Sequence, residues 1–314
     1  MSWLRLVWSD VTGRSRLAVV LGGGATLGAF EVGVIGALAE RGVRPDLLVG
    51  TSVGAINAAF WGFDPSPTMG RRLLAFWLRA HNSLFFPEGP VPMVGRLVQG
   101  KDHLTTQSAL AAMLTHALPG GARFEDASIP LAFTATEVGR GERVVIRTGP
   151  VLPAVLASSA IPALFPPVEI DGTRLADGGM VANCDIETAV AAGMTDVLVV
   201  DVMGDGVGTS PRNFWATAED ALGVMARRQT ELALRLFQDR ARIALIRPRL
   251  AQRGRVLDFG RTADLYADGY AVGDRFFAEG LVGRRVRPGL FEAGAERVPS
   301  VAAGRQRPVA HSTG

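Results

Sequence analysis

The fold class follows from residues 17–61, which read LAVVLGGGATLGAFEVGVIGALAERGVRPDLLVGTSVGAINAAFW. The run LAVVL at 17–21 is apolar throughout and ends in glycines, which is typical of a strand buried on both faces of a parallel sheet. A helix is expected at 29–41, a second strand at 47–49 and a second helix at 53–61. This order of elements predicts an α/β fold with a central, mostly parallel sheet flanked by helices.

The composition is that of a folded globular protein with a sizeable core. The chain has 314 residues, of which 48% are hydrophobic and 20% are charged. Its 33 basic and 30 acidic residues leave a net charge of +3, which is too balanced to indicate a nucleic-acid partner. The one cysteine, Cys184, excludes an internal disulfide framework and a multi-thiolate zinc site.

Residues 18–39 have nearly the length of a membrane span and carry a single charge, Glu31. They also contain six glycines, three of them consecutive, which favour a strand, a loop and a helix over one spanning helix. The first ten residues, MSWLRLVWSD, lack the apolar run of a secretory signal. We therefore expect a cytoplasmic protein without a transmembrane segment, peripheral at a membrane at most.

The rest of the chain continues the α/β pattern. Further strands are expected at 129–137, 143–147, 168–170, 173–175, 197–202 and 242–246, and further helices at 151–159, 186–192 and 214–240. Residues 63–104 contain five prolines and are interpreted as an insertion beside the sheet. We expect a core at 17–205, a helical extension of the same domain at 206–291, and a disordered tail at 292–314.

The sharpest signal for chemistry is GTSVG at 50–54, a G-x-S-x-G between an expected strand and an expected helix. This spacing is typical of a nucleophile elbow, in which the serine lies on a tight turn and Gly50 and Gly54 let the backbone segments cross. The N-terminus of the following helix favours an oxyanion formed beside the serine. The motif predicts Ser52 as a nucleophile.

A serine nucleophile needs a base, and the histidines are poorly placed to supply it. His81, His103 and His116 lie in or just after the insertion, and His311 lies in the tail. None follows a strand in the second half of the chain, where a triad hydrolase carries its histidine. A carboxylate acting directly on Ser52 is the economical alternative. A triad that uses His311 stays open, and it predicts that deleting the last ten residues abolishes activity.

Two further motifs add to this signal. The glycines at 22–24 follow the first strand, and their amides can converge on a phosphate or on an oxyanion. Their spacing fits no dinucleotide fingerprint, and the one lysine, Lys101, fits no P-loop. Asp177 begins a DGG sequence at a strand end, where its carboxylate either reaches the serine or closes a turn.

Together these motifs resemble the patatin-like phospholipases. The resemblance rests on GGG at 22–24, GTSVG at 50–54, ASSAIPALFPP at 157–167 and DGG at 177–179, and it covers residues 17–201. It implies a three-layer α/β sandwich and a Ser-Asp dyad that needs no histidine, no metal and no cofactor. It also implies a serine hydrolase that cleaves carboxylic esters of lipids, of phospholipase A or lysophospholipase type, through an acyl-enzyme.

The resemblance assigns roles to individual residues. Ser52 matches the nucleophile, Asp177 matches the base, and the amides of Gly23, Gly24 and Ala25 match the oxyanion hole. Gly22 belongs to the same glycine-rich loop of the oxyanion hole, and the supporting motif positions are Gly50, Gly54, Gly178 and Gly179. The implied partner is a lipid or another acyl ester, met in a transient contact with a membrane surface, and no nucleic acid is implied.

Two positions depart from the family pattern. Leu27 stands where the glycine loop usually carries a basic residue, and Asp185 stands where N-x-P has its proline. These departures keep a second interpretation open, a catalytically weak scaffold of the same fold that binds acyl chains or membranes. Turnover of a soluble ester that is lost in Ser52→Ala would distinguish the two.

Overall fold

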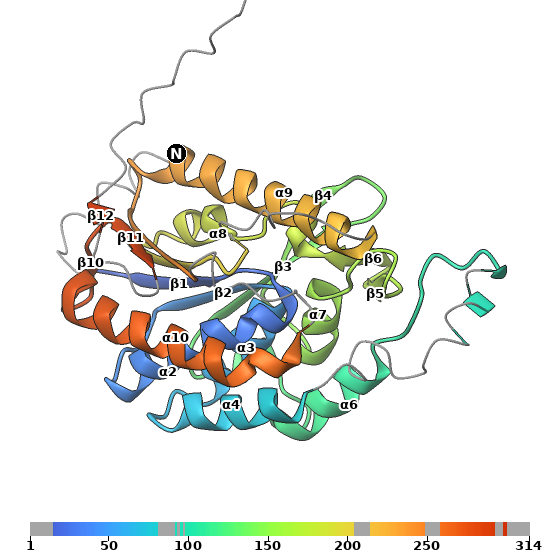
Figure 1. Ribbon diagram of the computed structural model, residues 1–314, viewed down its shortest axis with the longest axis horizontal. Helices are drawn as coiled ribbons and strands as arrows, with labels where there is room; N and C mark the ends of the chain where they lie inside the picture. Colours follow the sequence, from blue (N-terminus) through green and yellow to red (C-terminus); the bar gives the residue numbers. More distant parts are fainter. Residues whose placement is uncertain are drawn as a thin grey trace, which may run out of the picture.

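A ten-stranded, mostly parallel sheet forms the centre of the molecule (Figure 1). The computed structural model describes residues 15–80, 92, 95, 96, 98–203, 214–248, 258–292, 298 and 299. The strand order is β12-β11-β8-β7-β1-β2-β3-β6-β5, with β4 also paired to β3. The strands are β1 (Leu17–Leu21), β2 (Leu47–Thr51), β3 (Leu131–Glu137), β4 (Glu142–Ile146), β5 (Val168–Ile170), β6 (Thr173–Asp177), β7 (Asp196–Val200), β8 (Arg242–Arg247), β11 (Gly289–Glu292) and β12 (Val298–Pro299). Neighbours from β11 to β3 run parallel, which confirms the predicted fold class.

Helices cover both faces of this sheet (Figure 1). They are α2 (Gly28–Glu40), α3 (Val53–Phe63), α4 (Met69–Arg79), α6 (Ser108–Ala117), α7 (Val151–Ser158), α8 (Ile186–Ala191), α9 (Phe214–Phe237) and α10 (Thr262–Arg275). Helices α8 and α9 lie on one face, and α2, α3, α4 and α10 lie on the other. Alternate residues of β1 accordingly join different cores, because Leu17, Val19 and Leu21 face one side while Ala18 and Val20 face the other.

Helix α2 is buried almost throughout because α10 covers the side that the sheet leaves free. The two helices cross at glycines. A Cβ on Gly33 would lie 2.1 Å from the Tyr266 carbonyl oxygen, and one on Gly269 would lie 2.0 Å from the Phe30 carbonyl oxygen. The glycines of the apolar stretch thus serve close helix packing. Among the described helices, none is both long and apolar enough to cross a bilayer.

The structure refines several expected boundaries. The expected insertion at 63–104 contains the well-formed helix α4, which packs against α2. The strands β8 and β11, which follow residue 205, lie in the same sheet as β1, and α10 is a helix of the expected extension. The expected tail lies outside the described residues, except for Glu292 at the end of β11 and for β12, which pairs with β11.

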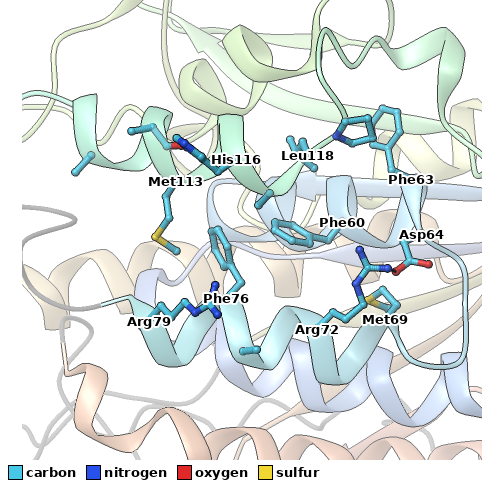
Figure 2. Close-up of a pocket in the computed structure, with 15 residues that line it drawn as sticks. Phe60, Phe63, Asp64, Met69, Arg72, Phe76, Arg79, Met113, His116 and Leu118 are labelled. Carbon is cyan, nitrogen blue, oxygen red and sulfur yellow. Dashed lines mark hydrogen bonds and ion pairs between the residues drawn. The ribbon is translucent and has the colours of Figure 1, made fainter.

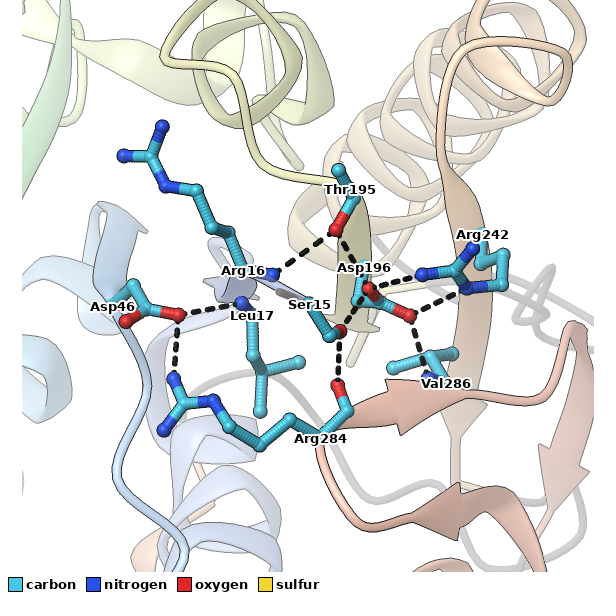
Figure 3. Close-up of polar contacts among 9 residues, drawn as sticks. All are labelled: Ser15, Arg16, Leu17, Asp46, Thr195, Asp196, Arg242, Arg284 and Val286. Carbon is cyan, nitrogen blue, oxygen red and sulfur yellow. Dashed lines mark hydrogen bonds and ion pairs between the residues drawn. The ribbon is translucent and has the colours of Figure 1, made fainter. Parts of the chain in front are cut away.

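Several segments meet around one buried carboxylate, Asp196, at the end of the sheet where the parallel strands begin (Figure 3). It accepts hydrogen bonds from Arg242 Nε at 2.7 Å, from the Val286 N–H at 2.7 Å, from Thr195 Oγ1 at 2.8 Å and from Ser15 Oγ. Burial alone would raise the pKa of Asp196, but these bonds outweigh it and hold the pKa below its ordinary value. The carboxylate therefore joins β7, β8 and the two-stranded sheet of β9 (Leu281–Val282) and β10 (Arg285–Val286).

Asp196→Ala is expected to lower the free energy of unfolding by about 2 kcal/mol at pH 7, because it leaves the buried Val286 N–H without its acceptor. Urea denaturation measures this loss, with Glu169→Ala at an exposed position of β5 as control. Since the pKa of Asp196 is lowered in the fold, its contribution is present above the ordinary value of 3.8 and is lost as the pH falls through the folded value. An equal loss in both variants would contradict the assignment.

Candidate active site

The site forms where two strands meet end to end along one edge of β3. Strand β2 runs parallel to β3 and ends with Thr51 opposite Thr134. Strand β6 runs antiparallel to β3 and ends with Asp177 opposite Ala135. Strand β4 occupies the other edge of β3 over the same residues, so β2 and β6 must share one edge. The residues that follow each strand are therefore brought together, although they are far apart in the chain.

Ser52 lies on the sharp turn between β2 and α3. Its backbone has φ 55° and ψ −121°, a conformation that side-chain-bearing residues rarely adopt and that costs about 1–3 kcal/mol. The side chain is 6% exposed. The turn places the hydroxyl at the N-terminus of α3, where the first helical amides carry partial positive charge.

The glycines on either side of Ser52 are required by close backbone contacts. A Cβ on Gly50 would lie 2.5 Å from Ala55 Cα, and one on Gly54 would lie 2.2 Å from the Leu21 carbonyl oxygen. Both distances are too short for any side chain. The G-x-S-x-G spacing thus lets α3 leave the strand steeply while it crosses β1.

Ser158, at the end of α7, holds the turn in place. Its Oγ accepts a hydrogen bond of 2.9 Å from the Ser52 N–H and donates one of 2.6 Å to the Thr134 carbonyl oxygen. The side chain is fully buried. The sequence assigned Ser158 no role of its own beyond its place in ASSAIPALFPP at 157–167. Its hydroxyl is a bridge between the turn and β3, and its place in the ASSAIP motif is the one signal that could have suggested this.

Asp177 ends β6 and is 7% exposed. The Gly179 N–H donates to its Oδ1 over 2.7 Å. Burial raises the pKa of Asp177 to about 6, against the opposing effects of the Ser52 side chain and the Gly179 N–H. A Cβ on Gly178 would lie 2.2 Å from the Thr134 carbonyl oxygen, so the DGG turn fits against β3 only with glycine there.

The glycine loop lies directly against Ser52. A Cβ on Gly23 would lie 3.2 Å from Ser52 Cβ. The amides of this loop are not all available, however. The Gly22 N–H donates to the Val200 carbonyl oxygen at 3.1 Å, and the Gly23 N–H donates to the Asn183 carbonyl oxygen at 3.3 Å. The Gly23 amide, which was expected in the oxyanion hole, thus already has an acceptor that holds the loop to the rest of the fold.

Gly24 and Ala25 differ from the two glycines before them. Within the described part of the chain, neither N–H has a hydrogen-bond partner. Ala25 has φ 46°, in the left-handed region, and begins the short helix η1 (Ala25–Leu27). Ala25 also lines the small cavity that contains Ser52. These two amides are the donors that the structure leaves open on this side of the serine.

Both departures from the family pattern have a structural explanation. Leu27 is 1% exposed and belongs to the apolar core, so no charged side chain is accommodated there. Asp185 caps α8 by accepting from the Thr188 N–H at 3.0 Å. It also accepts from Arg143 Nη1 at 2.6 Å and from Thr134 Oγ1 at 2.9 Å. A carboxylate thus starts α8 and joins it to β3 and β4.

The remaining candidates for chemistry lie apart from the serine. His103 pairs with the neighbouring carboxylate and His116 with a carbonyl oxygen of its own helix, and neither lines the Ser52 cavity. His81 and His311 lie outside the described residues. Burial raises the pKa of the Cys184 thiol well above its ordinary value, so this thiol is a buried apolar group. Across the described ranges, no group of three or more His, Cys, Asp or Glu side chains could hold a metal ion.

A buried polar chain behind the glycine loop was not predicted. Glu31, in the first turn of α2, accepts a 2.8 Å hydrogen bond from Asn57 Nδ2, and Trp77 Nε1 donates to Asn57 Oδ1 over 2.9 Å. Burial raises the pKa of Glu31 well above its ordinary value, while bonds from Asn57 and the Gly22 backbone act in the opposite direction. These hydrogen bonds join α2 and α3 to α4.

Similar known proteins place this chain in one family. A family model described as Patatin-like phospholipase matches residues 19–190, more than half of the chain. Over 306 residues the chain is 26% identical to Lysophospholipase nte1 of Aspergillus terreus, covering 84% of this chain and 18% of that protein. It is 27% identical over 284 residues to human Patatin-like phospholipase domain-containing protein 6, covering 83% and 20%. The chain therefore spans about a fifth of the length of these curated relatives.

Among solved structures, the chain is similar at a low TM-score, 0.41, to VipD from Legionella pneumophila, with 14% identity over 84% of this chain and 67% of that chain. It is also similar to human GIVD cytosolic phospholipase A2, with a TM-score of 0.37 and 15% identity over 71% of this chain and 43% of that chain. The family assignment rests on the sequence match, which includes the serine turn and the DGG turn. On that match, the chain belongs to the patatin-like phospholipase family.

Proposed function

We propose that this protein is a serine acyl hydrolase that cleaves carboxylic esters of lipids through a Ser-Asp dyad. The observation that carries the proposal is that Ser52 and Asp177 lie together at the ends of β2 and β6, both buried, with the serine on a strained turn at the head of a helix and acting on the pKa of the carboxyl. A nucleophile beside its base is the arrangement that covalent catalysis requires.

In the first half of the reaction, Ser52 Oγ attacks the ester carbonyl carbon while its proton passes to the Asp177 carboxylate. The tetrahedral intermediate then expels the alcohol, which takes the proton from Asp177, and the acyl group stays on Ser52. In the second half, water gives a proton to Asp177 and attacks the acyl carbon, and Ser52 leaves with that proton as the free acid is released. Asp177 ends in the ionised form in which it began.

The developing oxyanion needs donors that are already in place. The Gly24 and Ala25 amides, which have no partner among the described residues, support this role, and so does the N-terminus of α3. The orientation of this loop depends on Gly22 and Gly23, whose amides bind carbonyl oxygens elsewhere in the fold.

An aspartate of ordinary acidity is a weak base, and burial strengthens Asp177 in this role. A pKa of about 6 keeps the carboxylate mainly ionised at neutral pH while raising its affinity for the serine proton. The bond from the Gly179 N–H directs the carboxylate and leaves its other lone pairs free to accept from Ser52.

The names of the relatives support lipids as the substrate class. Lysophospholipase nte1 and Patatin-like phospholipase domain-containing protein 6 each match more than four fifths of this chain. Esters of the phospholipid or lysophospholipid type are accordingly the proposed substrates. The proposal includes a transient contact with the lipid surface from which such substrates are drawn.

Covalent labelling tests the proposal. An alkyl fluorophosphonate, which reacts with activated serines, is expected to modify one residue, and peptide mass spectrometry should locate the adduct on Ser52. Prior incubation with lysophosphatidylcholine should slow the labelling, and fatty acid should be released from that lipid. Labelling at another serine, or release of fatty acid by the Ser52→Ala variant, would contradict the proposal.

The scaffold interpretation remains the second candidate, because the cavity beside Ser52 has a volume of only about 20 Å³. A protein that binds acyl chains without turning over esters would bind lysophosphatidylcholine and release no fatty acid. Labelling of Ser52 together with release of the acid would exclude it.

A further inference from the structure

The cavity that contains Ser52 is too small for the proposed substrate. Its volume of about 20 Å³ has room for about one water molecule. Ala25, Ser52 and Val53 form one part of its lining, and side chains of α4, α6 and the segment after α7 close the rest. A wall of this cavity must therefore move before a long acyl chain can lie beside the serine.

A much larger cavity lies next to it, between the end of α3 and the helices α4 and α6 (Figure 2). Its volume is about 900 Å³, in the range of cavities that bind whole small molecules. Figure 2 shows Phe60, Phe76 and Met113 directed into this space. Arg72, whose guanidinium pairs with Asp64 at 2.6 Å, lies at its border. Apolar side chains thus share the lining of this cavity with charged ones, among them Arg72 and Arg79.

Phe76 separates the two cavities. Among the described lining residues, it is the one that both cavities share. Its ring lies 4.8 Å from the Phe60 ring, centroid to centroid, at an interplanar angle of 58°. Packing alone holds this ring, against Phe60 and, edge to face, against Trp77. The neighbouring Trp77, by contrast, is held by its hydrogen bond to Asn57.

We infer that the cavity between α3, α4 and α6 binds the distal part of a long acyl chain, and that displacement of the Phe76 ring joins this cavity to the one at Ser52. The inference rests on the proposed function, since Ser52 must hold the carbonyl end of the chain. Phe76 then acts as a specificity-determining residue. Short acyl groups react with the ring in place, whereas long ones need the ring displaced and use the larger cavity.

Burial of apolar surface explains why the larger cavity would make the enzyme prefer long acyl chains. Each methylene group that moves from water into the larger cavity raises kcat/KM by about fourfold, as long as the cavity continues. Ala109, Ala112 and Ala117 line the α6 side, and their small side chains leave the space open. A larger side chain on this wall should therefore shorten the chain that the enzyme accepts.

The test compares p-nitrophenyl butyrate with p-nitrophenyl dodecanoate. In Met113→Trp, kcat/KM for the dodecanoate is expected to fall at least tenfold, while the butyrate value stays within about twofold. Ala112→Phe, at an exposed position of α6, should act in the same direction and carries little risk of unfolding the protein. Thr115→Trp places the same bulk on α6 outside the cavity and should change neither value. Phe76→Ala should raise the ratio of dodecanoate to butyrate turnover about tenfold.

A binding measurement separates this inference from the proposed function. Titration of wild-type protein with dodecanoate should show binding that Met113→Trp and Ala112→Phe weaken at least tenfold and Thr115→Trp does not. Failure of the wild type to bind dodecanoate, or equal affinity in all variants, would overturn the inference even if esters are hydrolysed. Binding that responds to these variants without any ester turnover would uphold the cavity and overturn the hydrolase proposal.

Discussion

Ser52→Ala is expected to abolish ester hydrolysis, with kcat reduced on the order of 10⁴–10⁶-fold. In the proposed mechanism Ser52 Oγ forms the acyl bond, and the strained turn, the buried site and the adjacent carboxylate all act on that one atom. Hydrolysis of a short p-nitrophenyl ester measures the effect in solution, without a lipid surface.

Ser159→Ala is the matched control for this variant. Ser159 lines the same cavity, but its hydroxyl donates to the Val155 carbonyl oxygen inside its own helix turn. Its removal should leave kcat within a few fold of the wild type. If both variants lose activity equally, or if Ser52→Ala retains it, the assignment of the nucleophile is wrong. Thermal unfolding of each variant shows whether the fold is kept.

Asp177→Asn is expected to lower kcat by about 10²–10⁴-fold, the range that a positioned general base supplies. The amide can still accept the Gly179 N–H but cannot take a proton from Ser52. In the wild type, the same role predicts that kcat/KM rises with pH as the carboxyl ionises, with its midpoint at the Asp177 pKa of about 6. A wild-type profile that is flat between pH 5 and pH 8, or an active Asp177→Asn enzyme, would contradict the role.

The same substitution should make the protein more stable at pH 8. The pKa of Asp177 is raised from 3.8 to about 6, so the folded chain binds this proton more tightly than the unfolded chain. The stabilising contribution is full below the unfolded value and is lost as the pH rises through about 6. Asparagine removes that loss, so Asp177→Asn should gain up to about 3 kcal/mol of unfolding free energy at pH 8 and much less at pH 4. Urea denaturation at the two pH values measures the difference, which separates loss of function from loss of fold.

Features that depend on neighbours in the chain could be predicted. The run at 17–21 forms β1 with the expected limits, and the Asp171-Gly172 turn joins β5 and β6 with φ of 50° and 75° at its two residues. Such turns need left-handed backbone, and only a few residue types tolerate it, so the sequence carries the signal locally. The glycines at 50 and 54 are also a local signal, because the steep turn at Ser52 excludes side chains at both positions.

The availability of the loop amides could not be predicted. The sequence shows three adjacent glycines at 22–24 that look equivalent. The Val200 and Asn183 carbonyl oxygens, which come from distant parts of the chain, occupy the amides of Gly22 and Gly23. In this loop, the N–H groups of Gly24 and Ala25 have no acceptor among the described residues. No local sequence pattern distinguishes these two residues from Gly22 and Gly23.

The helix α4 could not be predicted either, because it too depends on contacts with distant parts of the chain. It begins shortly after Pro65 and Pro67, and its segment appeared to be a loose insertion. Its buried face, which includes Leu73 and Trp77, becomes a helix face only when α2 lies against it. The two cavities on either side of Phe76 depend on this packing as well.

The sequence by itself thus determined three features. They are the α/β order of elements, a serine on a turn that only small neighbours allow, and a carboxylate in a glycine turn. The tertiary structure alone decided that the serine and the carboxylate meet, because β2 and β6 share one edge of β3 from opposite directions. It also decided that Asp177 is a stronger base, since the pKa of a carboxyl depends on the burial and hydrogen bonds that distant segments supply.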